Sequence, residues 1–156
     1  MDFQKGANDT LSSIQQILLG SGLLTVCAVV HVLAVALSVP LFKSLATIVP
    51  EGKNPLRRII LFLLLTVAVL LGAHTVQIWV WAATFMLASE LPDVATSFYF
   101  SAVTYTTLGY GDVVLAEDAR IVATFCAITG LLTFGISTAF MIGVLSKVLP
   151  SGFGET

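Results

Sequence analysis

Charged residues are scarce in this chain, and their scarcity excludes most classes of soluble protein. They make up 10% of the sequence, while 57% of the residues are hydrophobic and the mean hydropathy is +1.00. Ordinary soluble domains carry about 25% charged residues. We therefore expect an integral membrane protein that contacts lipid and has no nucleic-acid partner.

Cysteine is also rare, which argues against a disulfide framework. Cys27 and Cys126 both lie in apolar segments, and we expect them to be small buried residues without a disulfide. A cleavable leader is not predicted either, because Asp2 and Asp9 stand where a basic segment would be needed. The first apolar segment should therefore be retained.

Three apolar runs, at 17–42, 59–89 and 121–146, are long enough to cross a membrane. A helix needs roughly 20 apolar residues to span the hydrocarbon core. The second run exceeds this length, so we expect it to tilt or project. The polar residues 1–16 should lie outside the cell, where their apolar spacing allows a short interfacial helix leading into the first span.

The connections between the runs differ in charge, and this difference predicts the orientation in the cell membrane. Residues 43–58 carry four basic side chains and one acidic one, so this loop should face the cytoplasm. Residues 90–118 carry five acidic side chains and should face outside. A multi-pass topology follows, with the N-terminus outside, the C-terminus cytoplasmic, and a tail at 149–156 too short for an attached ligand-binding domain.

A short helix is predicted between the second and third runs. Pro92 and Asp93 are typical of a helix start, and residues 93–105 are too few to span a bilayer. A half-crossing helix followed by extended chain is tolerated in a membrane only where the backbone is buried in protein or lines a water-filled path. The segment at 106–112, which follows directly, should line such a path.

This segment reads Thr-Thr-Leu-Gly-Tyr-Gly-Asp and resembles the selectivity filter of potassium channels. Gly109 and Gly111 give the backbone the freedom to point successive carbonyls one way. The resemblance implies an all-α membrane protein with the potassium-channel pore fold, a homotetramer that conducts K⁺ passively. The pore domain would span 59–148, with an outer helix at 59–89, a pore helix at 93–105 and an inner helix at 118–148; the first transmembrane helix is extra.

The resemblance also implies roles for single residues. The K⁺ ions would be bound by the carbonyls of the central filter residues, with the Thr107 hydroxyl completing the innermost site. The ion-binding residues would be Thr107, Leu108, Gly109 and Tyr110, and their supports would be Thr106, Gly111, Asp112, Tyr99 and Thr104.

Two supports depart from the family pattern. Many potassium channels have adjacent tryptophans in the pore helix, where this chain has Tyr99 and Phe100. Phe100 cannot donate a hydrogen bond, so we expect the bracing to be reduced or supplied by Thr104 or Tyr105. Val103 replaces a glutamate that pairs with the filter aspartate in some members, which leaves Asp112 without that partner. We therefore hypothesise altered inactivation.

In the third run, Gly130 lies where the family places a gating hinge, and Phe134 and Thr138 share its helical face. These three residues would form the inner gate or line the cavity. The alternative is close helix packing through small residues, which requires no hinge.

Cys27, His31 and His74 are ionisable groups inside the predicted spans, and such groups are candidates for function. They could form a zinc or copper site or a proton sensor, in which case the protein could be a metal-binding or pH-sensing membrane protein with a pore-like fold. The alternative is two neutral histidines that hydrogen-bond to neighbouring helices. The extra span has no series of arginines for voltage sensing, and no catalytic constellation predicts an enzyme.

Overall fold

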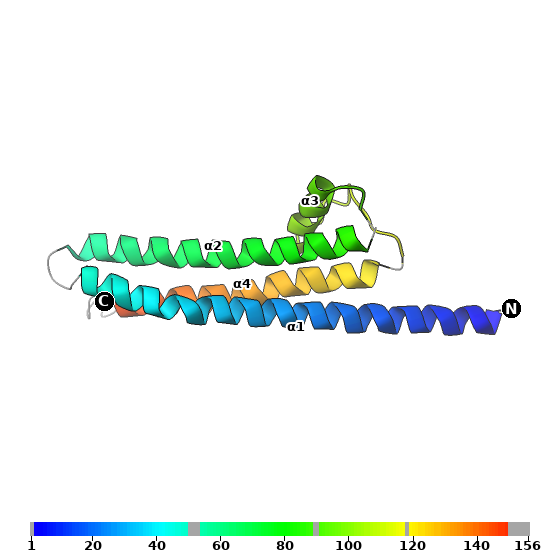
Figure 1. Cartoon of the computed structure of the whole chain (residues 1–156), viewed down its shortest axis with the longest axis horizontal. Helices are drawn as coiled ribbons and strands as arrows, with labels where there is room; N and C mark the ends of the chain where they lie inside the picture. Colours follow the sequence, from blue (N-terminus) through cyan, green and yellow to red (C-terminus); the bar gives the residue numbers. More distant parts are fainter. Residues whose placement is uncertain (1, 50–53, 89–90, 118, 150–156) are drawn as a thin grey trace, which may run out of the picture.

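The computed structural model describes residues 2–49, 54–88, 91–117 and 119–149. This part of the chain is all-helical. Three long helices lie side by side and a short one crosses one end of their bundle (Figure 1). The long helices are each long and apolar enough to cross a membrane, α1 from Ser12 onward. In chain order the elements are α1 (Asp2–Ile48), α2 (Pro55–Leu87), α3 (Val94–Tyr105) and α4 (Arg120–Val148).

The first helix is longer than predicted at both ends. It is continuous from Asp2, with no separate interfacial helix, and it projects beyond the neighbouring helices in Figure 1. At its other end it passes Pro40 and continues to Ile48. Phe42 explains this extension, because its ring lies 6.0 Å from that of Phe62 on α2 and 5.8 Å from that of Phe140 on α4. The helix therefore continues through the first residues of the loop that was predicted at 43–58.

The start of α3 follows from its capping residue. The Asp93 carboxylate accepts hydrogen bonds from the Thr96 backbone N–H at 2.9 Å and from the Thr96 hydroxyl at 2.8 Å. An aspartate in this position satisfies N–H groups that have no partner within the helix. The sequence placed this start at the same proline and aspartate.

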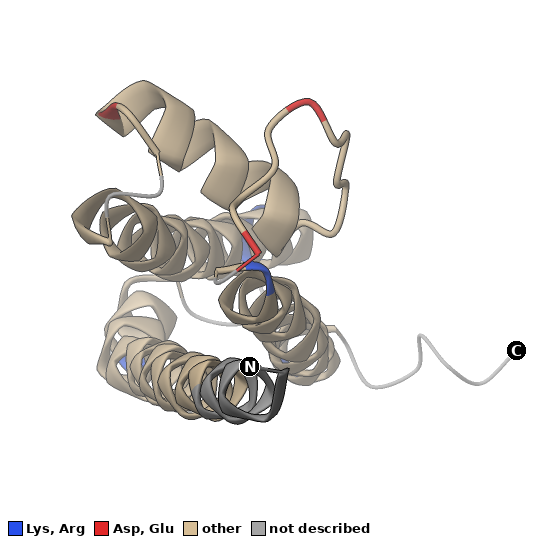
Figure 2. Ribbon diagram, turned by 90° about the vertical axis from the view of Figure 1, so that its right-hand side faces the viewer, with Lys and Arg blue, Asp and Glu red and all other residues tan. Residues whose placement is uncertain are grey.

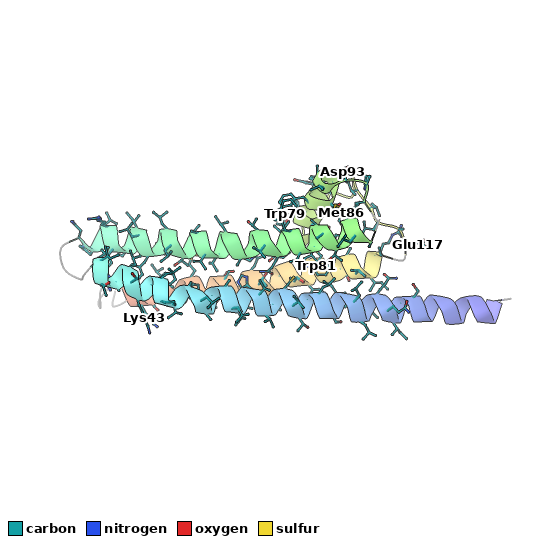
Figure 3. The ribbon with its side chains drawn as sticks, viewed as in Figure 1. Lys43, Trp79, Trp81, Met86, Asp93 and Glu117 are labelled. Atoms are coloured by element: carbon teal, nitrogen blue, oxygen red, sulfur yellow. The ribbon has the colours of Figure 1, made fainter. Side chains whose placement is uncertain are left out.

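A core at the α3 end of the bundle holds the short helix in place. Trp81 is fully buried and lies between α2 and α4, whereas Trp79 faces α3, where its ring lies 4.8 Å from that of Phe98 (Figure 3). Both cysteines are free and buried, as predicted. The buried cluster consists of Cys27, Trp81, Phe85, Leu91, Phe100, Tyr105, Leu115, Ala119, Val122 and Cys126.

Acidic residues gather at one end of the bundle, where Arg120 lies 3.9 Å from Glu117. Lys43 lies at one end, and Asp93 and Glu117 lie at the other (Figure 3). Figure 2 shows acidic residues along the connections at the end that carries α3. Between the ends, many large apolar side chains of the long helices are exposed in a single chain. Such surfaces suit contact with lipid or with further copies of the chain.

Candidate functional site

The candidate filter, residues 106–112, leaves the C-terminus of α3 and is tied back to it by backbone hydrogen bonds. The N–H of Thr107 donates to the carbonyl of Thr104 at 2.9 Å. The N–H groups of Leu108 and Gly109 both donate to the carbonyl of Val103, at 2.9 and 3.3 Å. The N–H groups at the start of this segment therefore face α3.

The sign of the backbone angle φ alternates along the segment. Every second residue has a positive φ: 60° at Thr107, 54° at Gly109 and 78° at Gly111. Alternation between right- and left-handed conformations turns successive N–H groups to one side. Thr107 is β-branched, and a positive φ is unusual for such a residue. The fold therefore holds a positive φ at three alternate positions of this segment, one of them a β-branched residue.

The candidate ion-binding residues lie on the surface of a single chain. Leu108 is 55% exposed and Tyr110 is 66% exposed, although both are large. One chain thus contributes one strip of backbone and covers it on the α3 side only. A closed ring of ligands around an ion needs further copies of the strip.

The Tyr99 hydroxyl braces the outer end of the segment. It donates a hydrogen bond of 2.6 Å to the Asp112 carboxylate, whose other oxygen accepts from the Val113 N–H at 3.1 Å. The bond from Tyr99 lowers the pKa of Asp112 and raises the pKa of Tyr99 itself. Asp112 therefore has a partner, although the glutamate found in some family members is replaced by Val103.

The remaining predicted supports act at the junction with α3. The Thr106 hydroxyl donates to the carbonyl of Ala102 at 2.8 Å, and Thr104 contributes its backbone carbonyl. The bracing was expected to be reduced or supplied by Thr104 or Tyr105, and the Tyr105 hydroxyl does not supply it. The Tyr105 side chain points into the bundle, where its hydroxyl contacts Gln77 and Thr133.

Gly130 makes a close contact in this structure. A Cβ built on it would overlap the carbonyl oxygen of Tyr105, so only glycine lets the C-terminus of α3 approach α4 this closely. Phe134 packs edge-on against Tyr105 with ring centroids 5.7 Å apart, and the Thr138 hydroxyl bonds within its own helix at 2.9 Å. Close packing thus explains Gly130, and the hinge stays a prediction.

The two histidines meet, but with hydrogen-bonding partners at each ring nitrogen. The ring centroids of His31 and His74 lie 4.9 Å apart. His31 contacts Gln77 at 2.8 Å and Ser137 at 3.0 Å, and His74 contacts Tyr105 at 2.8 Å and Ser137 at 2.9 Å. This arrangement matches the alternative of histidines bonded to neighbouring helices.

The predicted zinc or copper site gains no support from this geometry. Cys27 belongs to the apolar cluster. Among the described residues, no group of three or more His, Cys, Asp and Glu side chains is arranged to hold a metal ion. A metal would have to displace the hydrogen bonds that both histidines already make.

Sequence reasoning noted Gln77 only as a neighbour of His74 and did not link Thr133 or Ser137 to the histidines. Gln77, Thr133 and Ser137 are buried polar side chains in apolar helices. A polar residue inside a predicted span is a signal in itself, because it must find a partner there. The identity of that partner depended on how the helices pack.

Comparisons with known proteins agree with this architecture. A family described as "Ion channel" matches residues 61–147, which is more than half of the chain. The voltage-gated potassium channel Kch of Escherichia coli (strain K12) is 38% identical over 67 residues, which cover 42% of this chain and 15% of that protein. The A-type voltage-gated potassium channel KCND3 of Rattus norvegicus is 32% identical over 62 residues, covering 39% of this chain and 10% of that protein.

A third relative is the potassium voltage-gated channel subfamily A member 2 of Xenopus laevis, 34% identical over 55 residues, which cover 35% of this chain and 11% of that protein. The matches thus span only about a tenth to a seventh of the length of these curated relatives. No solved structure matches the chain significantly. The chain belongs to the ion channel family, with a pore domain of the potassium-channel type.

Proposed function

We propose that this protein is a potassium-selective channel that conducts K⁺ passively through a homotetrameric pore. The observation that carries the proposal is the positive φ at every second residue from Thr107 to Gly111, together with the N–H groups at the start of the segment that donate back to α3. The carbonyl oxygens of a filter segment can replace the hydration shell of K⁺. The ion-binding residues are Thr107, Leu108, Gly109 and Tyr110.

The tetramer follows from the incompleteness of the site in one chain. Each chain supplies one strip of carbonyls, and a ring of ligands around an ion takes about four strips related by cyclic symmetry. The pore domain would span 59–148, with α2 as outer helix, α3 as pore helix and α4 as inner helix. Helix α1 would lie outside the pore module, in contact with α2 and α4.

Orientation in the cell membrane is inferred from charge. Lys43 lies at the end of the bundle opposite Asp93 and Glu117 (Figure 3). The end with Lys43 would face the cytoplasm and the acidic end would face outside, where clustered carboxylates raise the local concentration of cations. The N-terminus would then be outside and the C-terminus cytoplasmic.

The test is potassium efflux from liposomes that contain the purified protein. We expect efflux from the wild-type protein and its loss in Gly109→Ala, because Gly109 has a φ of 54°. A matched control is Gly22→Ala on α1, where an added Cβ meets nothing within 4 Å. Efflux that persists in Gly109→Ala, or no efflux from a correctly assembled wild-type protein, would contradict the proposal.

A further inference from the structure

A network of six polar side chains lies inside the apolar bundle and joins all four helices. His31 comes from α1, His74 and Gln77 from α2, Tyr105 from α3, and Thr133 and Ser137 from α4. His31, Gln77, Tyr105 and Thr133 have no exposed surface in the structure, and Ser137 is buried. Unsatisfied polar groups are costly in such a place, so the position of each proton can be worked out from the contacts.

The orientation of Gln77 fixes the first proton. Its Nε2 lies 3.2 Å from the carbonyl of Ala73, and a carbonyl can only accept, so this atom is the amide nitrogen. The same nitrogen lies 2.8 Å from Nδ1 of His31, which must therefore accept. The proton of His31 is then on Nε2, and it is donated to the Ser137 hydroxyl oxygen at 3.0 Å.

The remaining protons follow from the second half of the network. The buried Oε1 of Gln77 accepts the proton of the Tyr105 hydroxyl at 3.1 Å. The Tyr105 oxygen therefore has no second proton to donate to His74. Nδ1 of His74, 2.8 Å from the Tyr105 hydroxyl, must therefore donate to it. Nε2 of His74 is then bare and accepts from the Ser137 hydroxyl at 2.9 Å.

These assignments close into a ring of five side chains in which each donates to the next. The direction runs from Gln77 to His31, Ser137, His74 and Tyr105, and back to Gln77. The sixth side chain, Thr133, has its hydroxyl 2.7 Å from that of Tyr105 and 2.8 Å from the carbonyl of Thr129. Its single proton can go to only one of these oxygens, and it completes the ring when it is donated to the remaining lone pair of Tyr105. The ring requires two neutral histidines in opposite tautomers.

An additional proton has no place in this ring. On Nδ1 of His31 it would face the N–H of Gln77, so two donors would oppose each other. On Nε2 of His74 it would face the hydroxyl proton of Ser137. Two charged histidines would also repel, since their ring centroids lie 4.9 Å apart.

The ring holds the residue from which the filter starts. Tyr105 is the last residue of α3, and the candidate filter begins at Thr106. The Tyr105 carbonyl also rests on Gly130 of α4. His31 is the member that α1 contributes, and α1 lies outside residues 61–147 that match the family.

We propose, on the basis of the channel function above, that His31 is a positioning residue through which α1 holds Tyr105 and the entrance of the filter, and that protonation of the His31–His74 pair opens the ring and reduces K⁺ conduction. The ring thus makes the extra helix a pH-sensitive regulator of the pore. The conducting state is the one with both histidines neutral.

No carboxylate or cation among the described residues is placed to dominate this titration. The titratable side chain from another helix that contacts these rings is Tyr105 of α3, and the thiols of Cys27 and Cys126 belong to the same buried cluster as Tyr105. Charged residues on the same helices are distant: at ~1.5 Å per residue, Lys43 is ~18 Å from His31 and Arg58 is ~24 Å from His74. On α4, Lys147 is ~15 Å from Ser137 by the same count.

The first test determines the protonation of the two histidines and does not depend on K⁺ conduction. The chain contains two histidines, so ¹⁵N-histidine labelling of an untagged protein in lipid gives two sets of ring signals, assigned with His31→Gln. At neutral pH we expect neutral rings in opposite tautomers, with the proton on Nε2 of His31 and on Nδ1 of His74. Identical tautomers, or a charged ring at neutral pH, would overturn the ring even if the protein conducts K⁺.

The second test compares pH profiles of K⁺ efflux. Acidification should reduce wild-type efflux by about 5- to 150-fold, the usual range for coupled sites in proteins. In His31→Gln and His74→Gln, which keep a polar group but cannot be protonated, this loss should be absent. Cys27→Ala, one turn from His31 and outside the ring, should keep the wild-type profile. An unchanged profile in both glutamine variants would overturn the proposal, whereas absence of all efflux would instead contradict the channel function.

Discussion

Replacement of Gly130 by alanine tests the contact on which the position of the pore helix depends. The added Cβ would overlap the carbonyl oxygen of Tyr105 and lie 3.3 Å from its ring. That carbonyl cannot rotate away as the end of a side chain could, because it belongs to the backbone of α3. The two helices must therefore separate, or α3 must shift.

The magnitude follows from two opposing terms. Overpacking a well-packed contact typically costs about 1–3 kcal/mol. The atom that the added Cβ would meet is a backbone oxygen of Tyr105, and the buried ring of Tyr105 holds this backbone in place. We therefore expect a cost near the upper end of that range. Alanine returns ~1 kcal/mol through its better helix propensity. We expect a net loss of about 2 kcal/mol, or a melting temperature lower by about 4–8 °C for a chain of this size.

The assay is thermal unfolding of the purified protein in detergent, followed by circular dichroism. Gly135→Ala is the matched control, because Gly135 lies on the same helix and its added Cβ meets nothing within 4 Å of the chain. This control should melt at the wild-type temperature or above. If Gly130→Ala were as stable as Gly135→Ala and altered only channel opening, Gly130 would act as a hinge and the packing explanation would be refuted.

Two further substitutions test the outer support of the filter and the docking of α1. Tyr99→Phe removes the bond that lowers the pKa of Asp112, so the carboxylate should protonate at a higher pH. Because the pKa of Asp112 is lowered in the folded state, the bond stabilises the protein at neutral pH, and this stabilisation is lost as the pH falls. The melting temperature of Tyr99→Phe should therefore fall less on acidification than that of the wild-type protein. If the two proteins showed the same dependence of melting temperature on pH, the bond would not be formed. Gly20→Leu should weaken the contact of α1 with α4, because its added Cβ would overlap the Phe125 ring, whereas Gly22 has open space. Crosslinking or thermal unfolding should therefore separate Gly20→Leu from Gly22→Leu, and equal behaviour of the two would contradict the close approach of α1 to α4.

Most of the architecture was predictable because it depends on local signals. Apolar length predicted the three long helices, and Pro92 with Asp93 predicted the start of α3. The candidate filter segment was located from its glycines and its neighbours in the sequence, and its role in ion binding stays a prediction. The structure then gives Thr107 and the two glycines the alternating backbone that such a filter needs.

What the sequence could not predict depends on which helix faces share the interior. His31 and His74 were expected near each other, but their partners Thr133 and Ser137 lie on α4, at a register that only packing decides. The hydroxyl of Tyr99 reaches Asp112 because the loop folds back on α3, a long-range contact that residue types alone do not specify. The end of α1 was placed too early because Phe42 packs against two other helices.

The most direct test of potassium selectivity is the reversal potential of single channels in a planar bilayer with K⁺ on one side and Na⁺ on the other. A filter built from the carbonyls of Thr107 to Tyr110 predicts a reversal potential far from zero, with the sign that opposes the flow of K⁺ toward the Na⁺ side. Gly109→Ala, whose φ of 54° disfavours any side chain, should abolish this selectivity or the current itself. A wild-type reversal potential near zero, with Na⁺ and K⁺ carried equally, would contradict the account.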